Sequence, residues 1–120
     1  MAGVPKDAGA ERQSKPGFLT VKAVKADELK PGAMKIVQAG RFAVAICNVD
    51  GVFYAIEDVC THDGGPLGEG TLEGCEVECP RHGARFDVKT GAVTRMPAIV
   101  PVQTFPVRVE AGWVLVEAEA

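Results

Sequence analysis

An all-β domain of small antiparallel sheets is the fold class that this sequence of 120 residues predicts. Beyond residue 17 the chain runs in short segments of alternating apolar and polar residues, separated by Gly, Pro and Asp, which is typical of antiparallel strands. Asp50-Gly51 is a strong signal for a two-residue hairpin, and Ala111-Gly112 separates the last two alternating segments. The helical candidate, Asp27–Lys30, has room for a single turn before Pro31-Gly32.

The individual strands are placed by this alternation and by the turn residues between them. Gly40 divides two strands, and Asp50-Gly51 joins the second of them to the next. Glu73-Gly74 and Lys89-Thr90-Gly91 each divide a pair of short strands later in the chain. In chain order, the expected strands are Phe18–Val24, Met34–Ala39, Arg41–Val49, Val52–Glu57, Thr71–Leu72, Glu76–Glu78, Arg85–Val88, Ala92–Thr94, Thr104–Glu110 and Trp113–Glu117.

One domain is expected over residues 18–120, preceded by a disordered tail over residues 1–17. A chain of this length can bury a core without disulfides. The first residues are polar and rich in Lys, Gly and Ala, which is typical of disorder, and they contain no apolar run of the secretory type. No apolar stretch of about 20 residues is present to span a membrane. The expected compartment is therefore a reducing cytoplasm, with cysteines kept for metal.

Two short motifs contain both histidines of the chain. They are Cys60-Thr61-His62 and Cys79-Pro80-Arg81-His82, separated by residues 63–78. Each motif offers one thiolate and one imidazole. Two cysteines and two histidines suit either one tetrahedral zinc ion or a [2Fe–2S] cluster whose two irons have unlike ligands. The choice between these two centres decides the function.

The spacing of the motifs favours the cluster over zinc. Zinc modules usually space their ligands in like pairs, C-x₂₋₄-C and H-x₃₋₅-H, often with a helix after them. Here each pair is mixed, and expected strands surround both motifs. Gly64, Gly65 and Gly83 loosen the two loops, and a small cluster needs close backbone approach because its sulfides accept N–H bonds. A zinc module, which would be colourless, remains the alternative at this point.

The residues around both motifs resemble the two cluster-binding loops of Rieske proteins. Gly64-Gly65-Pro66-Leu67 follows the first motif closely, and Gly83-Ala84-Arg85-Phe86-Asp87 follows the second. From about Phe18 to the C-terminus, the sequence is most similar to the small Rieske-type ferredoxins that serve bacterial ring-hydroxylating dioxygenases. This resemblance implies a Rieske-type antiparallel β-sandwich in which two loops form an iron–sulfur cluster-binding subdomain.

The resemblance also implies the cofactor and its ligands. One [2Fe–2S] cluster is expected per chain. Cys60 and Cys79 would bind one iron through their thiolates. His62 and His82 would bind the other iron through the ring nitrogen nearest the main chain, with their far nitrogens facing solvent. The residues expected to keep water away from the cluster are Pro66, Leu67 and Pro97–Pro101.

The function that the resemblance implies is one-electron transport by a soluble, low-potential ferredoxin that is not itself an enzyme. Its expected partners are a flavin- or NAD(P)H-dependent reductase, which supplies the electron, and a terminal oxygenase, which accepts it. A monomer is expected, with no membrane and, because the net charge is only −3, no nucleic acid. The alternative is a small Rieske-fold subunit of a nitrite reductase, or an accessory protein of another redox complex.

Four positions predict a potential near the bottom of the Rieske range, which spans about −150 to +300 mV. High-potential members of the family have a disulfide between the loops where this chain has Gly65 and Arg81. They also have hydroxyl donors to the cluster where this chain has Ala84 and Phe86. Without those donors the negative charge of the reduced cluster is less stabilised, and the potential falls.

The remaining candidate residues have plainer interpretations. Cys47 is expected to be a small packed side chain on the strand face opposite Val44 and Ile46, and Cys75 an incidental surface cysteine. Eight acids and no Lys or Arg lie between residues 42 and 80, either as a collar that steers a cationic partner or as solvated loops. A basic group, either a docking patch or solvated β-surface, comprises Arg81, Arg85, Lys89 and Arg95.

Overall fold

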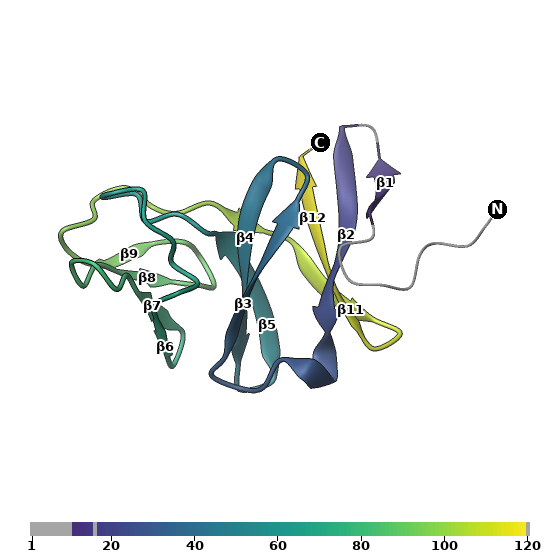
Figure 1. The fold of residues 1–120 in the computed structure, drawn as a ribbon, viewed down its shortest axis with the longest axis horizontal. Coiled ribbons are helices and arrows are strands. Elements are labelled where there is room, and N and C mark those ends of the chain that lie inside the picture. Colours follow the sequence, from purple (N-terminus) through teal and green to yellow (C-terminus); the bar gives the residue numbers. More distant parts are fainter. Residues whose placement is uncertain (1–10, 16, 120) are drawn as a thin grey trace.

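The structure, a computed structural model, describes residues 11–15 and 17–119 (Figure 1). In this part the chain forms three antiparallel sheets of four strands. The elements are β1 (Glu11–Lys15), β2 (Phe18–Lys25), the 3₁₀ turn η1 (Ala26–Glu28), β3 (Met34–Ala39), β4 (Phe42–Val49), β5 (Val52–Glu57), β6 (Thr71–Glu73), β7 (Glu76–Glu78), β8 (Arg85–Asp87), β9 (Val93–Arg95), β10 (Thr104–Phe105), β11 (Val107–Glu110) and β12 (Trp113–Glu119).

The predicted all-β class is confirmed, and the three sheets follow one another along the molecule. The first sheet has the strand order β1-β2-β12-β11, the second β10-β5-β4-β3 and the third β6-β7-β8-β9. In Figure 1 the second sheet lies between the other two. No helix of the described residues is long and apolar enough to cross a membrane.

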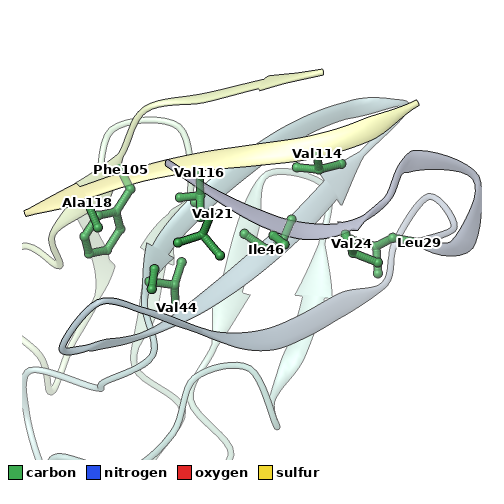
Figure 2. Packing of buried hydrophobic residues seen from close by; sticks show 12 residues of the cluster. Val21, Val24, Leu29, Val44, Ile46, Phe105, Val114, Val116 and Ala118 are labelled. Carbon is green, nitrogen blue, oxygen red and sulfur yellow. The ribbon is translucent and has the colours of Figure 1, made fainter. Parts of the chain in front are cut away.

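The second sheet is buried on both faces, and β4 shows this most clearly. Side chains alternate along a strand. Val44 and Ile46 therefore point into a core shared with β2 and β12 (Figure 2), while Ala45 and Cys47 point into a second core with β7, β8 and the loops beyond them. Cys47 is fully buried, which confirms its prediction as a small packed side chain.

The long strand expected over Thr104–Glu110 is divided at Pro106. β10 pairs with β5 in the second sheet, whereas β11 pairs with β12 in the first. Proline has no N–H to donate to a ladder, so a strand is readily interrupted there. The Pro106 carbonyl still accepts a hydrogen bond from the Glu117 N–H at 3.0 Å. The chain thus passes from one sheet to the other at the proline and joins the two layers.

The first sheet begins earlier than the sequence predicts. Glu11–Lys15, expected as part of a tail, forms β1 and pairs with β2 in the register Glu11↔Val21. Gly17, with φ +81°, lies between the two strands. The rest of the expected tail, residues 1–10 and 16, lies outside the described residues.

The cluster-motif loops are attached to the second and third sheets. The first loop leaves β5 at Glu57 and returns to β6, and the second joins β7 to β8. At Gly70 the first loop runs so close to β7 that a Cβ would overlap the Glu78 carbonyl oxygen. Gly91 likewise lies directly against the Val102 carbonyl. The first contact fixes the first motif loop to the third sheet, and the second fixes the segment after β9 to the turn between β8 and β9.

Candidate metal centre

The two motif loops close on themselves in the same way. The Cys60 N–H donates to the Gly65 carbonyl at 2.7 Å, and the Gly64 N–H donates back to the Cys60 carbonyl at 2.7 Å. In the second loop, the Cys79 N–H donates to the Ala84 carbonyl at 2.8 Å, and the Gly83 N–H donates to the Cys79 carbonyl at 3.2 Å. Each cysteine therefore anchors a tight turn through its own peptide groups.

Glycine is required at the same place in both turns. Gly64 and Gly83 each lie four residues after the cysteine, and each has φ +79°. This left-handed conformation is accessible to glycine at little cost and strained for residues with a Cβ. The glycines noted in the sequence thus serve the turn that presents each cysteine–histidine pair.

The structure brings the four motif residues together as two pairs. The sulfurs of Cys60 and Cys79 and a carboxylate oxygen of Asp63 all lie within 4.8 Å of one another. A ring nitrogen from each of His62 and His82 makes a similar group of three with Asp63. The thiols are buried, at 1% exposure each, whereas both imidazoles are exposed. The rings meet edge to face, with centroids 5.3 Å apart.

This arrangement fits two metal atoms better than one. Two thiolates on one tetrahedral metal, with bonds of about 2.3 Å, lie about 3.8 Å apart, which is compatible with the cysteine pair. A single Cys₂His₂ zinc would require all four ligand atoms to converge, yet within the described residues the close groups keep sulfur and nitrogen apart. A [2Fe–2S] cluster with sulfur ligands inside and nitrogen ligands outside matches the two pairs.

Apolar residues surround the cysteine pair. Leu67, Ala84, Phe86 and Ala98 are buried in the same core as Cys60 and Cys79. The expected shield is therefore present at Leu67, but in the Pro97–Pro101 segment the buried residue is Ala98, and both prolines are exposed. Within this segment, Ala98 is therefore the residue that shields the cysteine pair.

Burial also acts on the thiols themselves. It raises the pKa of Cys60, chiefly by desolvation, with the nearby Cys79 thiol acting in the same direction. A buried thiolate needs a positive charge beside it. A bound metal supplies that charge and deprotonates the thiol on binding. The donor chemistry of the inner pair therefore fits a metal centre.

Asp63 is a site residue that the sequence pattern alone did not identify. Its Oδ1 accepts a hydrogen bond from the Gly65 N–H at 2.9 Å, while its Oδ2 lies 3.1 Å from His82 Nδ1 and 3.3 Å from Arg81 Nε. The Gly65 N–H first, and then His82 and Arg81, lower the pKa of the Asp63 carboxyl. The sequence does contain a signal for this role. Asp63 directly follows a histidine of the motif and stands two residues before Gly65, and aspartates at such positions accept hydrogen bonds that close tight turns.

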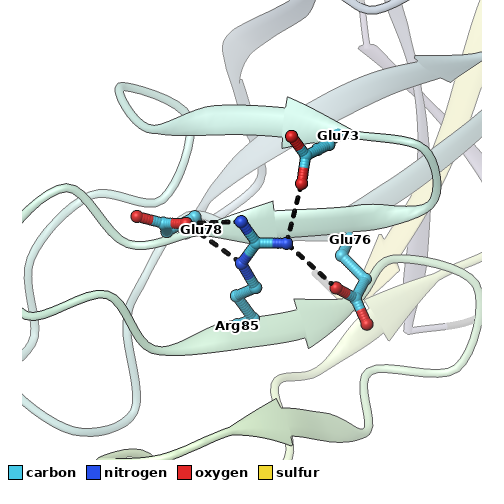
Figure 3. Close-up of polar contacts among 4 residues, drawn as sticks. All are labelled: Glu73, Glu76, Glu78 and Arg85. Atoms are coloured by element: carbon cyan, nitrogen blue, oxygen red, sulfur yellow. Dashed lines mark hydrogen bonds and ion pairs between the residues drawn. The ribbon is translucent and has the colours of Figure 1, made fainter.

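Arg85, one of the basic residues considered for docking, is occupied within the third sheet. Its guanidinium binds Glu73 at 3.0 Å, Glu78 at 2.8 Å and Glu76 at 3.3 Å (Figure 3). These hydrogen bonds, that of Glu73 foremost, raise its pKa above the ordinary range for arginine. Arg85 and three of the eight acids are therefore engaged with one another across β6, β7 and β8, and the guanidinium offsets one of their three negative charges. This contact weakens both the docking-patch and the acidic-collar interpretations.

Fold and site together define an all-β iron–sulfur domain of the two-cysteine, two-histidine type. The family model described as "Rieske [2Fe-2S] domain" matches residues 20–106. The chain therefore belongs to the Rieske family and binds a [2Fe–2S] cluster.

The ferredoxin component of biphenyl 2,3-dioxygenase from Rhodococcus jostii is 44% identical over 92 residues, which cover 77% of this chain and 86% of that protein. Among solved structures, the chain is similar to the one titled as a complex of reduced oxygenase and oxidized ferredoxin in carbazole 1,9a-dioxygenase. That match has a TM-score of 0.80 and 40% identity, and covers 83% of this chain and 94% of the other.

The comparisons also separate the two functional alternatives. A structure titled as a putative small subunit of an NADH-dependent nitrite reductase from Mycobacterium tuberculosis has a TM-score of 0.76 but only 25% identity, covering 86% of this chain and 97% of that one. The ferredoxin components are the more similar by sequence. The chain is accordingly an electron-transfer protein of the ferredoxin type and not a catalytic subunit.

Proposed function

We propose that this chain carries single electrons from a flavin- or NAD(P)H-dependent reductase to the terminal oxygenase of a ring-hydroxylating system. The observation that carries the proposal is the contrast within the site. The cysteine pair is buried, whereas the His82 side chain is 54% exposed and His62 is exposed beside it. A cluster held by these four residues exchanges electrons through its outer, histidine side. The relatives' names, as a dioxygenase ferredoxin component and as a ferredoxin in complex with an oxygenase, support the oxygenase as the acceptor.

Each ligand has a separate part in this proposal. Cys60 and Cys79 hold the inner iron within the apolar core, and His62 and His82 hold the outer iron at the surface. Leu67 and Ala98 exclude water from the inner side. The bound cluster supplies a site that gains and loses one electron. A cytoplasmic location is proposed with it, since all four cysteines are free thiols, as a reducing compartment would keep them.

An exchange experiment tests the proposed direction of transfer. The chain, reduced under anaerobic conditions, is mixed in a stopped-flow instrument with the oxidised terminal oxygenase of the carbazole 1,9a-dioxygenase system. Its visible spectrum is expected to return to the oxidised form, with one electron passed per chain. Mixing the oxidised chain with NADH and a ferredoxin reductase is expected to reverse the change. Failure of both exchanges, while the ferredoxin of that system supports them, would contradict the proposal.

Two exposed apolar side chains, Ile99 and Val100, form a rim attached to the first motif loop, and this rim is proposed as the oxygenase contact. Ile99 is 80% exposed and Val100 54% exposed. The rim is attached to the first motif loop, because Thr61 Oγ1 donates a hydrogen bond to the Val100 carbonyl at 2.6 Å. Exposed apolar patches of this kind mark interaction sites.

The contact is tested by Val100→Asp. An unpaired charge in a desolvated contact is expected to lower the rate constant for reduction of the oxygenase by about tenfold, with the potential unchanged. Val52→Asp is the matched control, because Val52 is also 54% exposed but lies at the opposite end of β5 from the first loop. Equal rates for the two variants would remove the rim from the interface.

A low potential is proposed for the cluster on the basis of Ala84 and Phe86. Both side chains are fully buried in the core of the cysteine pair, and neither has a hydroxyl to donate. Ala84→Ser is expected to raise the midpoint potential by several tens of millivolts, since a donated hydrogen bond stabilises the reduced, more negative cluster. Protein-film voltammetry measures this midpoint potential. A potential equal to that of the wild type would show that the missing donor is not the cause.

A further inference from the structure

The two motif loops are held together by side chains, not by a covalent bond. All four cysteines are free thiols. The backbone hydrogen bonds at Cys60 and Cys79 remain within their own loops. In the described part of the chain, both ion-pairing contacts between the loops end on one carboxylate, that of Asp63. Besides the shared apolar core and the contact between the two imidazole rings, that side chain is therefore the polar link between the two cysteine–histidine pairs.

Asp63 is well placed for this role. Its side chain is 13% exposed, although its partners Arg81 and His82 are 59% and 54% exposed. One carboxylate oxygen is fixed to its own loop by the Gly65 N–H at 2.9 Å, and the other reaches the second loop, 3.3 Å from Arg81 Nε. A carboxylate that is shielded and already fixed by a backbone donor loses little further entropy when it pairs with Arg81.

Arg81 is in turn held by the shape of the first loop. A Cβ at Gly65 would lie 2.7 Å from Arg81 Cδ and 3.2 Å from Asp63 Oδ1. The absence of a side chain at residue 65 therefore makes room for the arginine stem, which packs over the backbone of the first loop. Three residues from the two loops therefore form one contact: the Asp63 carboxylate, the Arg81 guanidinium and the Gly65 backbone against which the arginine stem packs.

The same carboxylate lies close to every proposed ligand. An Asp63 oxygen is within 4.8 Å of both the sulfur pair and the imidazole pair. His82 Nδ1, which Asp63 contacts at 3.1 Å, is also the nitrogen proposed to bind iron. With iron on that nitrogen, the contact of Asp63 that still joins the two loops is the one to Arg81, while the Gly65 N–H holds the carboxylate within its own loop.

We propose that Asp63 and Arg81 form a non-covalent cross-link that positions the two cluster-binding loops and slows loss of the cluster. The proposal rests on the proposed function, because it takes the four motif residues as the cluster ligands. Asp63 and Arg81 are positioning residues: they act through Cys60, His62, Cys79 and His82 and do not bind iron.

The test compares Asp63→Asn, Arg81→Gln and the double variant. Asparagine keeps the acceptor for the Gly65 N–H but loses the charge, and glutamine keeps part of the arginine stem. In the presence of a ferrous chelator, the decay of the cluster's visible absorbance is expected to be about five- to tenfold faster in each single variant than in the wild type. The double variant is expected to decay no faster than the single ones, because both changes remove the same contact.

Two controls separate the cross-link from general effects. Arg41→Gln removes a surface pair of the same length, 3.3 Å to Glu119, far from the loops and is expected to leave the decay unchanged. The midpoint potential gives a second readout: loss of the Arg81 charge lowers it and loss of the Asp63 charge raises it. Two loops that are merely loosened would not shift it in opposite directions. Arg81→Lys is expected to restore part of the stability of the cluster.

Several outcomes would overturn the proposal. The first is cluster decay at the wild-type rate in either single variant. The second is a double variant whose decay is accelerated by the product of the two single effects. The third is a midpoint potential that shifts in the same direction in Asp63→Asn and Arg81→Gln. Failure of the proposed function is recognised separately, because the wild-type chain would then fail to exchange electrons with the oxygenase and the reductase, whatever the decay rates of the variants.

Discussion

Cys79→Ala is expected to yield a folded chain without the visible absorbance of a [2Fe–2S] cluster. Cys79 is one of the two buried thiols whose sulfurs lie within 4.8 Å of each other. Alanine offers no ligand, and the inner iron would retain a single thiolate in an apolar core that water does not reach. Iron and acid-labile sulfide are expected to fall from two of each per chain to near zero. Circular dichroism would verify that the sheets remain.

The chain supplies its own matched controls for this change. Cys47 and Cys75 are also free thiols, and the structure puts neither in a close group with the motif residues. Cys47→Ala and Cys75→Ala are both expected to keep the cluster. Burial raises the pKa of Cys47 to about 12, so this thiol stays neutral at ordinary pH unless a metal lies beside it, and among the described residues no second ligand is grouped with it. A colourless Cys75→Ala variant, or a coloured Cys79→Ala variant, would show that the ligand set is wrong.

Local turn chemistry explains why the strands were predictable. Val52–Glu57 and Glu76–Glu78 agree with the prediction residue for residue. Asp50-Gly51 carries the positive φ angles that its hairpin needs, +51° and +91°. Such signals depend on neighbouring residues only, and sequence patterns record them well. The division at Pro106 had a local signal as well, because proline has no N–H. In the prediction, the alternation of apolar and polar residues on both sides of Pro106 outweighed that signal.

The order of the strands had no such signal. β12 pairs with β2, and β10 with β5, across long stretches of chain. Pairing at this distance is decided by which faces can be buried together, not by local propensity. The apolar residues on both faces of β4 are consistent with a middle layer, but they do not say which sheets lie on either side.

The site shows the same division between local and distant information. The four motif residues stand out by residue type and spacing, and the structure groups them in two pairs. Asp63 was counted only as one acid in an acidic run, because its role depends on Arg81 and His82 in the other loop. Arg85 was considered for docking because the sequence does not show which strands pair. The pairing of β6, β7 and β8 brings Glu73 and Glu78 beside it. Contacts between loops become visible only once the fold is known.

His62→Cys is expected to lower the midpoint potential of the cluster by on the order of 100 mV or more. Two ferric ions, two sulfides and two thiolates sum to zero charge, and a third thiolate makes the oxidised site negative. An electron is added to a negative site less readily, which is why four-thiolate clusters lie near −400 mV and Rieske clusters near −150 mV or above. Cysteine is the informative replacement because it still ligates iron.

The same variant separates the histidine ligand from its surroundings. His62 is exposed, so its far ring nitrogen is open to solvent. In general, an oxidised metal on one imidazole nitrogen favours loss of the proton on the other. Cysteine has no such nitrogen, so the part of the pH dependence that His62 contributes at high pH is expected to disappear. Voltammetry between pH 6 and about 11 measures both effects, with Thr61→Ser as the control for a change in the loop that leaves ligation intact. A pH–potential curve that coincides with the wild-type curve would exclude His62 as a ligand of the cluster, because neither the charge nor the proton of the site would then have changed.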